Sequence, residues 1–263
     1  TAFGKSGDDL KSEIFESMKT NRLQVANRLG ARNPWSQGIV DSTGYPDGYG
    51  PASQDVLLYS FLSAYTGTSP DKVKLKTFPT IPLPNWRITF DGLMNIEFIK
   101  KYLRNITLSH AYRSTYNIGS FTTNMQYDEL DGFAYARYTG NNNFIPEQEI
   151  AMVSINEQFS PLINVDMTWN NSLMSKIEYK KTRNLSFSFV NNQLTEVISN
   201  EFIIGLGYRI KDVEFIIRTL GGGGKRTQMS SDLNIKADFS IRTNKTTLRR
   251  IDEDINQISS GQK

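Results

Sequence analysis

The chain has 263 residues, of which 38% are hydrophobic and 11% aromatic, enough for a sizeable core if it folds into a globule. Its 30 Lys and Arg residues are scattered among 27 Asp and Glu residues, so the charge pattern gives no indication of nucleic-acid binding. It has no cysteine and one histidine, which excludes disulfides and thiolate metal sites and leaves little for histidine-based catalysis. No run approaches the ~18 apolar residues of a membrane-spanning helix, but transmembrane strands, which hide apolar residues at every second position, remain possible.

The first part of the chain has the three- and four-residue apolar spacing of helices. It predicts a helix over residues 8–29, closed by Gly30, and a second helix over residues 54–66, closed by Gly67. Loops rich in Gly, Pro, Asn and Asp connect these segments. We therefore expect residues 1–82 to form a helical insertion between strands.

From Trp86 onward the apolar spacing changes to two, which is typical of strands with one polar and one apolar face. Residues 233–241 alternate without error, and residues 150–169 are predicted to be one strand interrupted only at Pro161. At about seventeen residues or more, such strands exceed both the ~5–6 residues usual in globular proteins and the ~9–11 of a simple membrane-spanning strand. Residues 83–263 are thus predicted to be long antiparallel strands.

Asparagine-rich turns predict how these strands pair. Counting back from the turns sets Val165 opposite Ile177 and Tyr179 opposite Ile204, so three strands share one apolar face. Phe187, Phe189, Val153 and Ile155 lie further along that face, beyond a polar belt of Glu157, Lys181, Arg183 and Asn200. We expect this second apolar group to pack on the inserted helices or on a partner.

The two faces of the predicted sheet suggest two environments. We interpret one set as contacting lipid, with Trp and Tyr near its edges: Ile163, Val165, Met167, Trp169, Ile177, Tyr179, Phe202, Ile204, Leu206 and Tyr208. The alternate positions are predicted to line an aqueous lumen: Asn164, Asp166, Glu178, Lys180, Asn234, Lys236 and Asp238.

Several long strings of the sequence resemble one protein family. They are NRLQVANRLG (21–30), FLSAYTG (61–67), PNWRITFDGL (84–93), LSHAYRSTYNIGSF (108–121), SINEQFSPLINVDM (154–167), IEYKKTRNLSFSF (177–189) and SDLNIKADFSIRTNKT (231–246). In this order they are similar to the C-terminal region of the SprA/Sov family, the translocon of the type IX secretion and gliding-motility apparatus of Bacteroidota. The resemblance covers nearly the whole chain.

The resemblance implies a mainly β fold, part of a very large transmembrane β-barrel in the outer membrane. It implies export of folded cargo proteins with C-terminal signal domains, without enzymatic activity, cofactor or metal. The implied partners are this cargo, a PorV-type barrel, a periplasmic plug protein and the lipid bilayer, with no nucleic acid. The chain stops at SSGQK, short of the last strands of family members, so we expect a fragment of a longer protein.

Other motifs are interpreted structurally. His110 is expected to be a hydrogen-bonded structural histidine, and the acidic residues within 128–131 a solvated loop. The glycine-rich stretch 221–227 does not fit a phosphate loop and is predicted to be a hairpin tip. Glu147 and Glu149 are expected at an exposed strand end.

Two other functions remain open on the sequence. A nutrient-receptor barrel of the TonB-dependent kind would carry a plug domain and an energy-coupling box upstream. A secreted soluble β-protein would instead bind glycans or protein through exposed aromatic residues.

Overall fold

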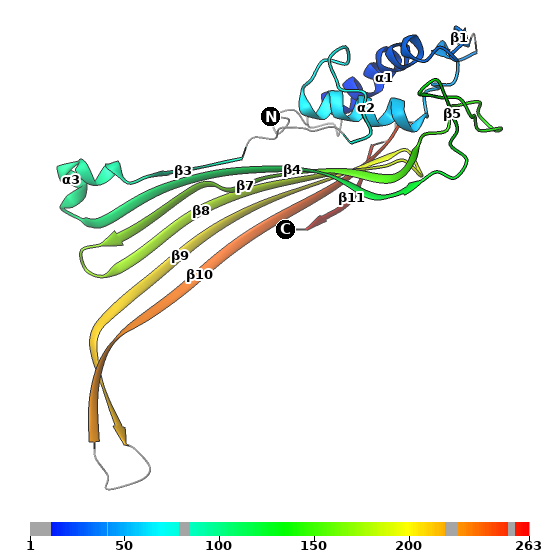
Figure 1. The fold of residues 1–263 in the computed structure, drawn as a ribbon. Coiled ribbons are helices and arrows are strands. Elements are labelled where there is room, and N and C mark those ends of the chain that lie inside the picture. The colour runs from blue at the N-terminus through cyan, green and yellow to red at the C-terminus, as the bar shows by residue number, and fades with distance from the viewer. Residues whose placement is uncertain (1–11, 41, 79–84, 219–225, 252–255, 263) are drawn as a thin grey trace.

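The computed structural model describes residues 12–40, 42–78, 85–218, 226–251 and 256–262. Long antiparallel strands dominate these residues, and two helices pack on one end of the sheet that the strands form (Figure 1). The helices are α1 (Glu13–Arg32), α2 (Gln54–Thr66), the short α3 (Glu97–Lys100) and the 3-10 helix η2 (Gly92–Asn95). The strands are β1 (Ile39–Val40), β2 (Tyr45–Pro46), β3 (Trp86–Phe90), β4 (Leu103–Thr123), β5 (Glu129–Leu130), β6 (Phe133–Ala134), β7 (Gln148–Trp169), β8 (Leu173–Ser188), β9 (Gln193–Arg218), β10 (Arg226–Arg250) and β11 (Asn256–Gln262).

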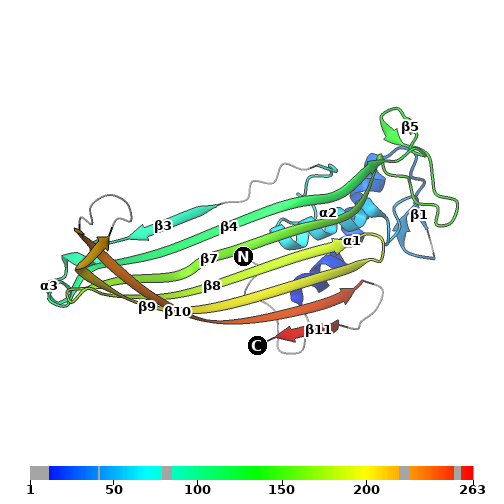
Figure 2. The same cartoon turned by 90° about the horizontal axis from the view of Figure 1, so that it is seen from below.

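Within the described residues, one sheet of seven strands has the order β11-β10-β9-β8-β7-β4-β3, with every neighbouring pair antiparallel. The five central strands contain 16 to 26 residues each, which confirms the predicted length. Figure 2 shows them side by side over most of their length. In the described part of the chain the sheet is open, with β3 and β11 at its edges. The mainly β, antiparallel fold with N-terminal helices is therefore confirmed.

The predicted pairing of β7 with β8 is confirmed, and that of β8 with β9 is wrong by two residues. Val165 lies opposite Ile177 as expected, whereas Tyr179 lies opposite Phe202 instead of Ile204. The β8–β9 turn is longer than predicted, because the last pair before it joins Ser188 to Gln193. A shift of two residues leaves each side chain on its original face, so the predicted apolar face is preserved.

Helix α1 begins and ends differently from the prediction. The Ser12 hydroxyl accepts a hydrogen bond from the Phe15 backbone N–H at 3.3 Å and caps the first turn. The helix then continues through Gly30 to Arg32. A Cβ at Gly30 would lie 2.7 Å from the Pro46 side chain, so this glycine permits close packing and does not end the helix.

Helix α2 anchors the helices to the sheet. It ends at Gly67 in the left-handed conformation, as predicted, with a φ of 68°. The Phe61 ring stacks on Phe187 of β8 with 5.9 Å between centroids, and Val153 and Ile155 of β7 lie in the same core. The apolar group beyond the polar belt therefore packs on the helices, which is one of the two alternatives expected.

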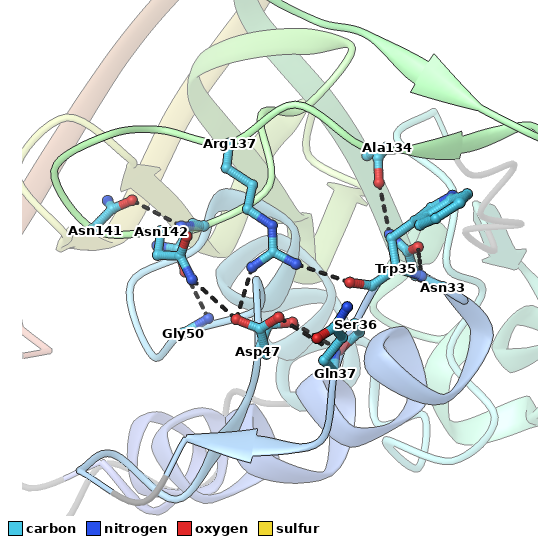
Figure 3. A network of polar contacts seen from close by, with 11 residues as sticks. Asn33, Trp35, Ser36, Gln37, Asp47, Gly50, Ala134, Arg137, Asn141 and Asn142 are labelled. Atoms are coloured by element: carbon cyan, nitrogen blue, oxygen red, sulfur yellow. Dashed lines mark hydrogen bonds and ion pairs between the residues drawn. The ribbon is translucent and has the colours of Figure 1, made fainter.

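Residues 124–147, which connect β4 to β7, join the helices in one unit (Figure 3). The Arg137 guanidinium pairs with the Asp47 carboxylate at 2.7 Å and donates to the Trp35 carbonyl oxygen at 2.8 Å. The Asn33 side-chain amide donates to the Ala134 carbonyl oxygen at 2.9 Å. The boundary predicted at residue 82 leaves this connection out of the helical insertion.

Two carboxyl groups of this unit have shifted pKa values. The hydrogen bond from Arg137 holds the pKa of Asp47 below its usual value. Burial at the start of α2 raises the pKa of Asp55 to about 6. Asp47 therefore favours the fold when ionised, whereas Asp55 favours it when protonated, a contribution that is lost as the pH rises from 3.8 to about 6.

We predict that Phe187→Ala loosens α2 from the sheet, because truncating a fully buried phenylalanine costs about 3–5 kcal/mol. Hydrogen exchange of the α2 amides should accelerate by about 100-fold or more, since ~1.4 kcal/mol is a factor of ten. Phe98→Ala is the matched control, because that ring is 72% exposed. Unchanged α2 exchange in Phe187→Ala would contradict the proposed docking.

Candidate functional site

One face of the sheet carries a continuous apolar band over six strands. At the centre of the band, one apolar residue from each strand lies directly opposite one from the next strand. Together they form a row, or level, across the sheet: Phe90, Leu108, Val165, Ile177, Ile204 and Phe239. Further levels continue the band toward the α3 end, with Ile106, Met167 and Leu206, and toward the helical unit, with Ile88, Ile163, Tyr179, Phe202 and Ile241. Each strand therefore contributes apolar side chains at the same height.

All ten residues predicted to contact lipid lie on this face. Six are exposed, with exposed fractions from 39% at Phe202 to 58% at Ile163. The other four, Val165, Met167, Trp169 and Tyr179, are half-buried by their neighbours. The helical unit occupies the same face but packs on the opposite end of the strands (Figure 1). The band is thus a large exposed apolar surface, which marks a site for lipid or another molecule.

The band is wider than the sequence-based list. Strand β3 adds Trp86, Ile88 and Phe90, all exposed, and β10 adds Leu233, Ile235, Phe239 and Ile241. The alternation in β10 predicted its apolar face but not its neighbour in the sheet. In β3 the apolar residues Trp86, Ile88 and Phe90 show the same alternation, but over only five residues.

Aromatic side chains with polar atoms occupy the edges of the band. Toward the helical unit, the Trp86 and Tyr112 rings lie 4.5 Å apart and the Tyr112 and Phe159 rings 4.7 Å apart. At the other edge, the Trp169 indole N–H donates to the Ser175 hydroxyl at 2.9 Å. Aromatic rings with a polar tip suit the boundary between hydrocarbon and water.

The opposite face of the same strands is polar, and all seven residues predicted to line a lumen lie there. The Glu178 carboxylate pairs with Lys176 at 2.9 Å and Lys180 at 3.6 Å. In the next strands, Glu201 pairs with Arg242 at 3.0 Å. Five of the predicted residues share the lining of a cavity of about 580 Å³: Asp166, Glu178, Lys180, Lys236 and Asp238.

A buried charge network lies beyond the apolar band, at the edge of the core under the helices. The Glu196 carboxylate accepts from Arg183 Nε at 2.7 Å and from Arg249 Nη1 at 2.6 Å. Glu157 lies 3.7 Å from Arg183 and accepts a hydrogen bond from the Tyr112 hydroxyl at 2.8 Å. All four charged residues are at most 7% exposed. The predicted polar belt included Glu157 and Arg183 but missed Glu196 and Arg249.

Helix α2 covers part of this network. The Arg183 guanidinium lies 5.7 Å from the centre of the Tyr65 ring. Burial raises the pKa of the Tyr65 hydroxyl, so the ring stays neutral against the ion pairs. The network carries two acids and two bases and runs diagonally across β7, β8, β9 and β10, since Glu196 lies opposite Leu185 and Arg249 lies opposite Leu194.

Among the remaining motifs, His110 has the expected structural role, whereas the loop predicted at 128–131 contains strand β5 of a short hairpin. His110 Nδ1 forms a hydrogen bond of 2.6 Å with the Leu162 carbonyl oxygen. Glu147 and Glu149 are exposed, and so are the acidic residues within 128–131. Most of the glycine-rich tip predicted at 221–227 lies outside the described residues.

In the described part of the chain, no group of three or more His, Cys, Asp or Glu side chains could hold a metal ion. Among the described helices, none is long and apolar enough to cross a membrane. No protein-family model and no curated protein matches the chain.

We predict that Glu196→Gln destabilises the protein by about 3–5 kcal/mol, because removing one partner of a buried ion pair leaves uncompensated charge, here on Arg249, while Arg183 keeps the 3.7 Å contact with Glu157. Urea-induced unfolding of the complete protein measures the loss. Glu201→Gln, a partly exposed acid on the polar face, should change stability by less than about 1 kcal/mol. Equal losses of stability in the two variants would show that the buried network stabilises the fold no more than a partly exposed ion pair does.

Proposed function

We propose that the chain forms part of the wall of an outer-membrane protein-conducting channel, which secretes folded cargo with C-terminal signal domains. The observation that carries the proposal is the apolar level running across six neighbouring strands, with charged side chains on the opposite face of the same strands. A wall between lipid and water requires this division. The proposed class of transported substrate comes from the sequence resemblance to the SprA/Sov family.

The height of the band supports a membrane environment. On β9 it extends from Phe202 to Ile210, which corresponds to about 27 Å along a strand at ~3.4 Å per residue. A tilt of ~40° reduces this to about 21 Å along the barrel axis, close to the ~25 Å apolar zone of transmembrane barrels. The remaining strand length then stands outside the hydrocarbon.

The helical unit lies outside the bilayer in this arrangement. It packs on the same face as the band, and the charge network lies between the two. Ion pairs of this kind are costly in hydrocarbon, so the network marks the membrane boundary. The unit would stand beside the barrel wall above that boundary.

The polar face would act as a hydrated wall along which cargo can pass. Acidic and basic side chains alternate on it, as in Lys176, Glu178 and Lys180, so it presents no strong field of one sign. A folded cargo protein would meet a hydrated, mixed-charge surface with few apolar contacts. The open edges at β3 and β11 are where further strands would continue the wall, and where a PorV-type barrel or a periplasmic plug protein would complete the apparatus.

Cell fractionation tests the membrane assignment. The complete protein should resist extraction from cell envelopes by carbonate or urea, because the band would be held by lipid. Deletion of its gene should leave cargo with C-terminal signal domains in the periplasm. Recovery of the protein in the soluble fraction would favour a secreted β-protein, and normal secretion in the deletion strain would favour a nutrient receptor.

We predict that Ile204→Lys costs about 2–4 kcal/mol in folding into lipid bilayers, as expected for lysine at the bilayer midplane. The neighbouring Ile203→Lys is the matched control, because Ile203 lines the polar cavity with Glu178 and Glu201. It should cost less than about 1 kcal/mol, since its ammonium group remains hydrated near acidic side chains. Denaturant titration of the folded protein in vesicles measures both, and equal costs would contradict the assignment of the two faces.

A further inference from the structure

The connection between β3 and β4 exposes apolar side chains at the end of the sheet opposite the helical unit (Figure 1). It contains η2 and α3, and its exposed fractions are 49% at Ile96, 72% at Phe98 and 47% at Tyr102. Apolar side chains exposed close together form a patch of the kind that contacts lipid or another molecule. These three side chains are therefore a candidate contact site for lipid.

The connection is held in place by contacts with the neighbouring β7–β8 turn. The Asn170 backbone N–H donates to the Tyr102 carbonyl oxygen at 3.1 Å, and its side-chain amide donates to the Lys101 carbonyl oxygen at 3.0 Å. The Phe98 and Tyr102 rings meet edge to face with 5.4 Å between centroids. The exposed rings are thus presented by an ordered segment.

Basic side chains lie next to these rings in the sequence, and one of them contacts a ring. Lys100, Lys101 and Arg104 are exposed, and Lys101 Nζ lies 5.7 Å from the centre of the Tyr102 ring. Two acids of the same segment, Asp91 and Glu97, leave an excess of one positive charge, with all three cations following the exposed Phe98. Aromatic rings next to lysine are typical of segments that lie in the headgroup region of a bilayer.

The segment is continuous with the edge of the apolar band. Leu103, the next residue after Tyr102, pairs with Trp169 at the aromatic edge. At this end β7 and β8 are joined by a short turn and β3 and β4 by residues 91–102, whereas the larger helical unit and residues 124–147 lie at the other end. Short connections are typical of the periplasmic side of such barrels.

We propose that residues 91–104 bind the headgroups of anionic phospholipids in the adjacent leaflet, with Phe98 inserted among the acyl chains and Lys100 and Lys101 at the phosphates. This inference rests on the proposed membrane location and adds a lipid-selective site to it. The site would fix the height of the wall in the bilayer at the α3 end.

Site-specific quenching tests the proposal, and the absence of cysteine from the chain makes single labels possible. The complete protein, with any cysteine outside this sequence replaced, would carry a bimane label at Phe98→Cys. It would be reconstituted with phosphatidylcholine and phosphatidylglycerol, one of which carries a doxyl group near the headgroup. We expect the anionic lipid to quench about fivefold more strongly or better, since each lysine contributes about 1 kcal/mol near an anionic surface.

Charge removal and a second label separate the outcomes. Lys100→Gln with Lys101→Gln should bring the quenching ratio close to one, whereas Lys72→Gln with Lys74→Gln, two exposed lysines after α2, should leave it unchanged. A label at Ile204→Cys reports whether the band contacts lipid at all. Quenching at position 204 without selective quenching at position 98 would overturn the headgroup site alone. Absence of quenching at both would overturn the membrane location as well.

Discussion

Backbone hydrogen bonding between long antiparallel strands is the constraint on which the other features depend. Because side chains alternate strictly along a strand, the pairing register decides which residues of every neighbour share a face. The pairing of Val165 with Ile177, and of Ile177 with Ile204, brings single apolar residues from separate strands into one level. The same pairing places the Glu178 and Lys180 ion pairs on the opposite face. One register thus produces two surfaces of opposite character.

The buried charges around Glu196 divide the apolar face into two parts with different partners. On one side, Val153, Ile155 and Phe187 are covered by the helices of the same chain. On the other side, many of the apolar residues are exposed, among them Ile163, Ile204 and Phe239. A soluble protein would need a second layer over this part as well. A membrane wall needs none, since hydrocarbon covers it, and this difference leads us to favour a channel wall.

The helical unit shows how distant segments combine. Asp47, between α1 and α2, pairs with Arg137 from the β4–β7 connection, and Gln54 at the start of α2 donates to the Gln148 carbonyl oxygen of β7. These contacts join residues about ninety positions apart in the sequence. Alternation and helical spacing are local patterns, so they carry no signal for such contacts. The unit therefore had to be found in the tertiary structure.

The sequence by itself determined the two N-terminal helices, the long strands and the two faces, because period and turn residues are local. It also placed each of the seventeen proposed lipid- and lumen-facing residues on its face. Only the tertiary structure decided the two-residue shift between β8 and β9, the entry of β3 into the band, and the pairing of Glu196 with Arg249. These depend on turn length, strand order and cross-strand packing, which involve residues that the local pattern does not connect.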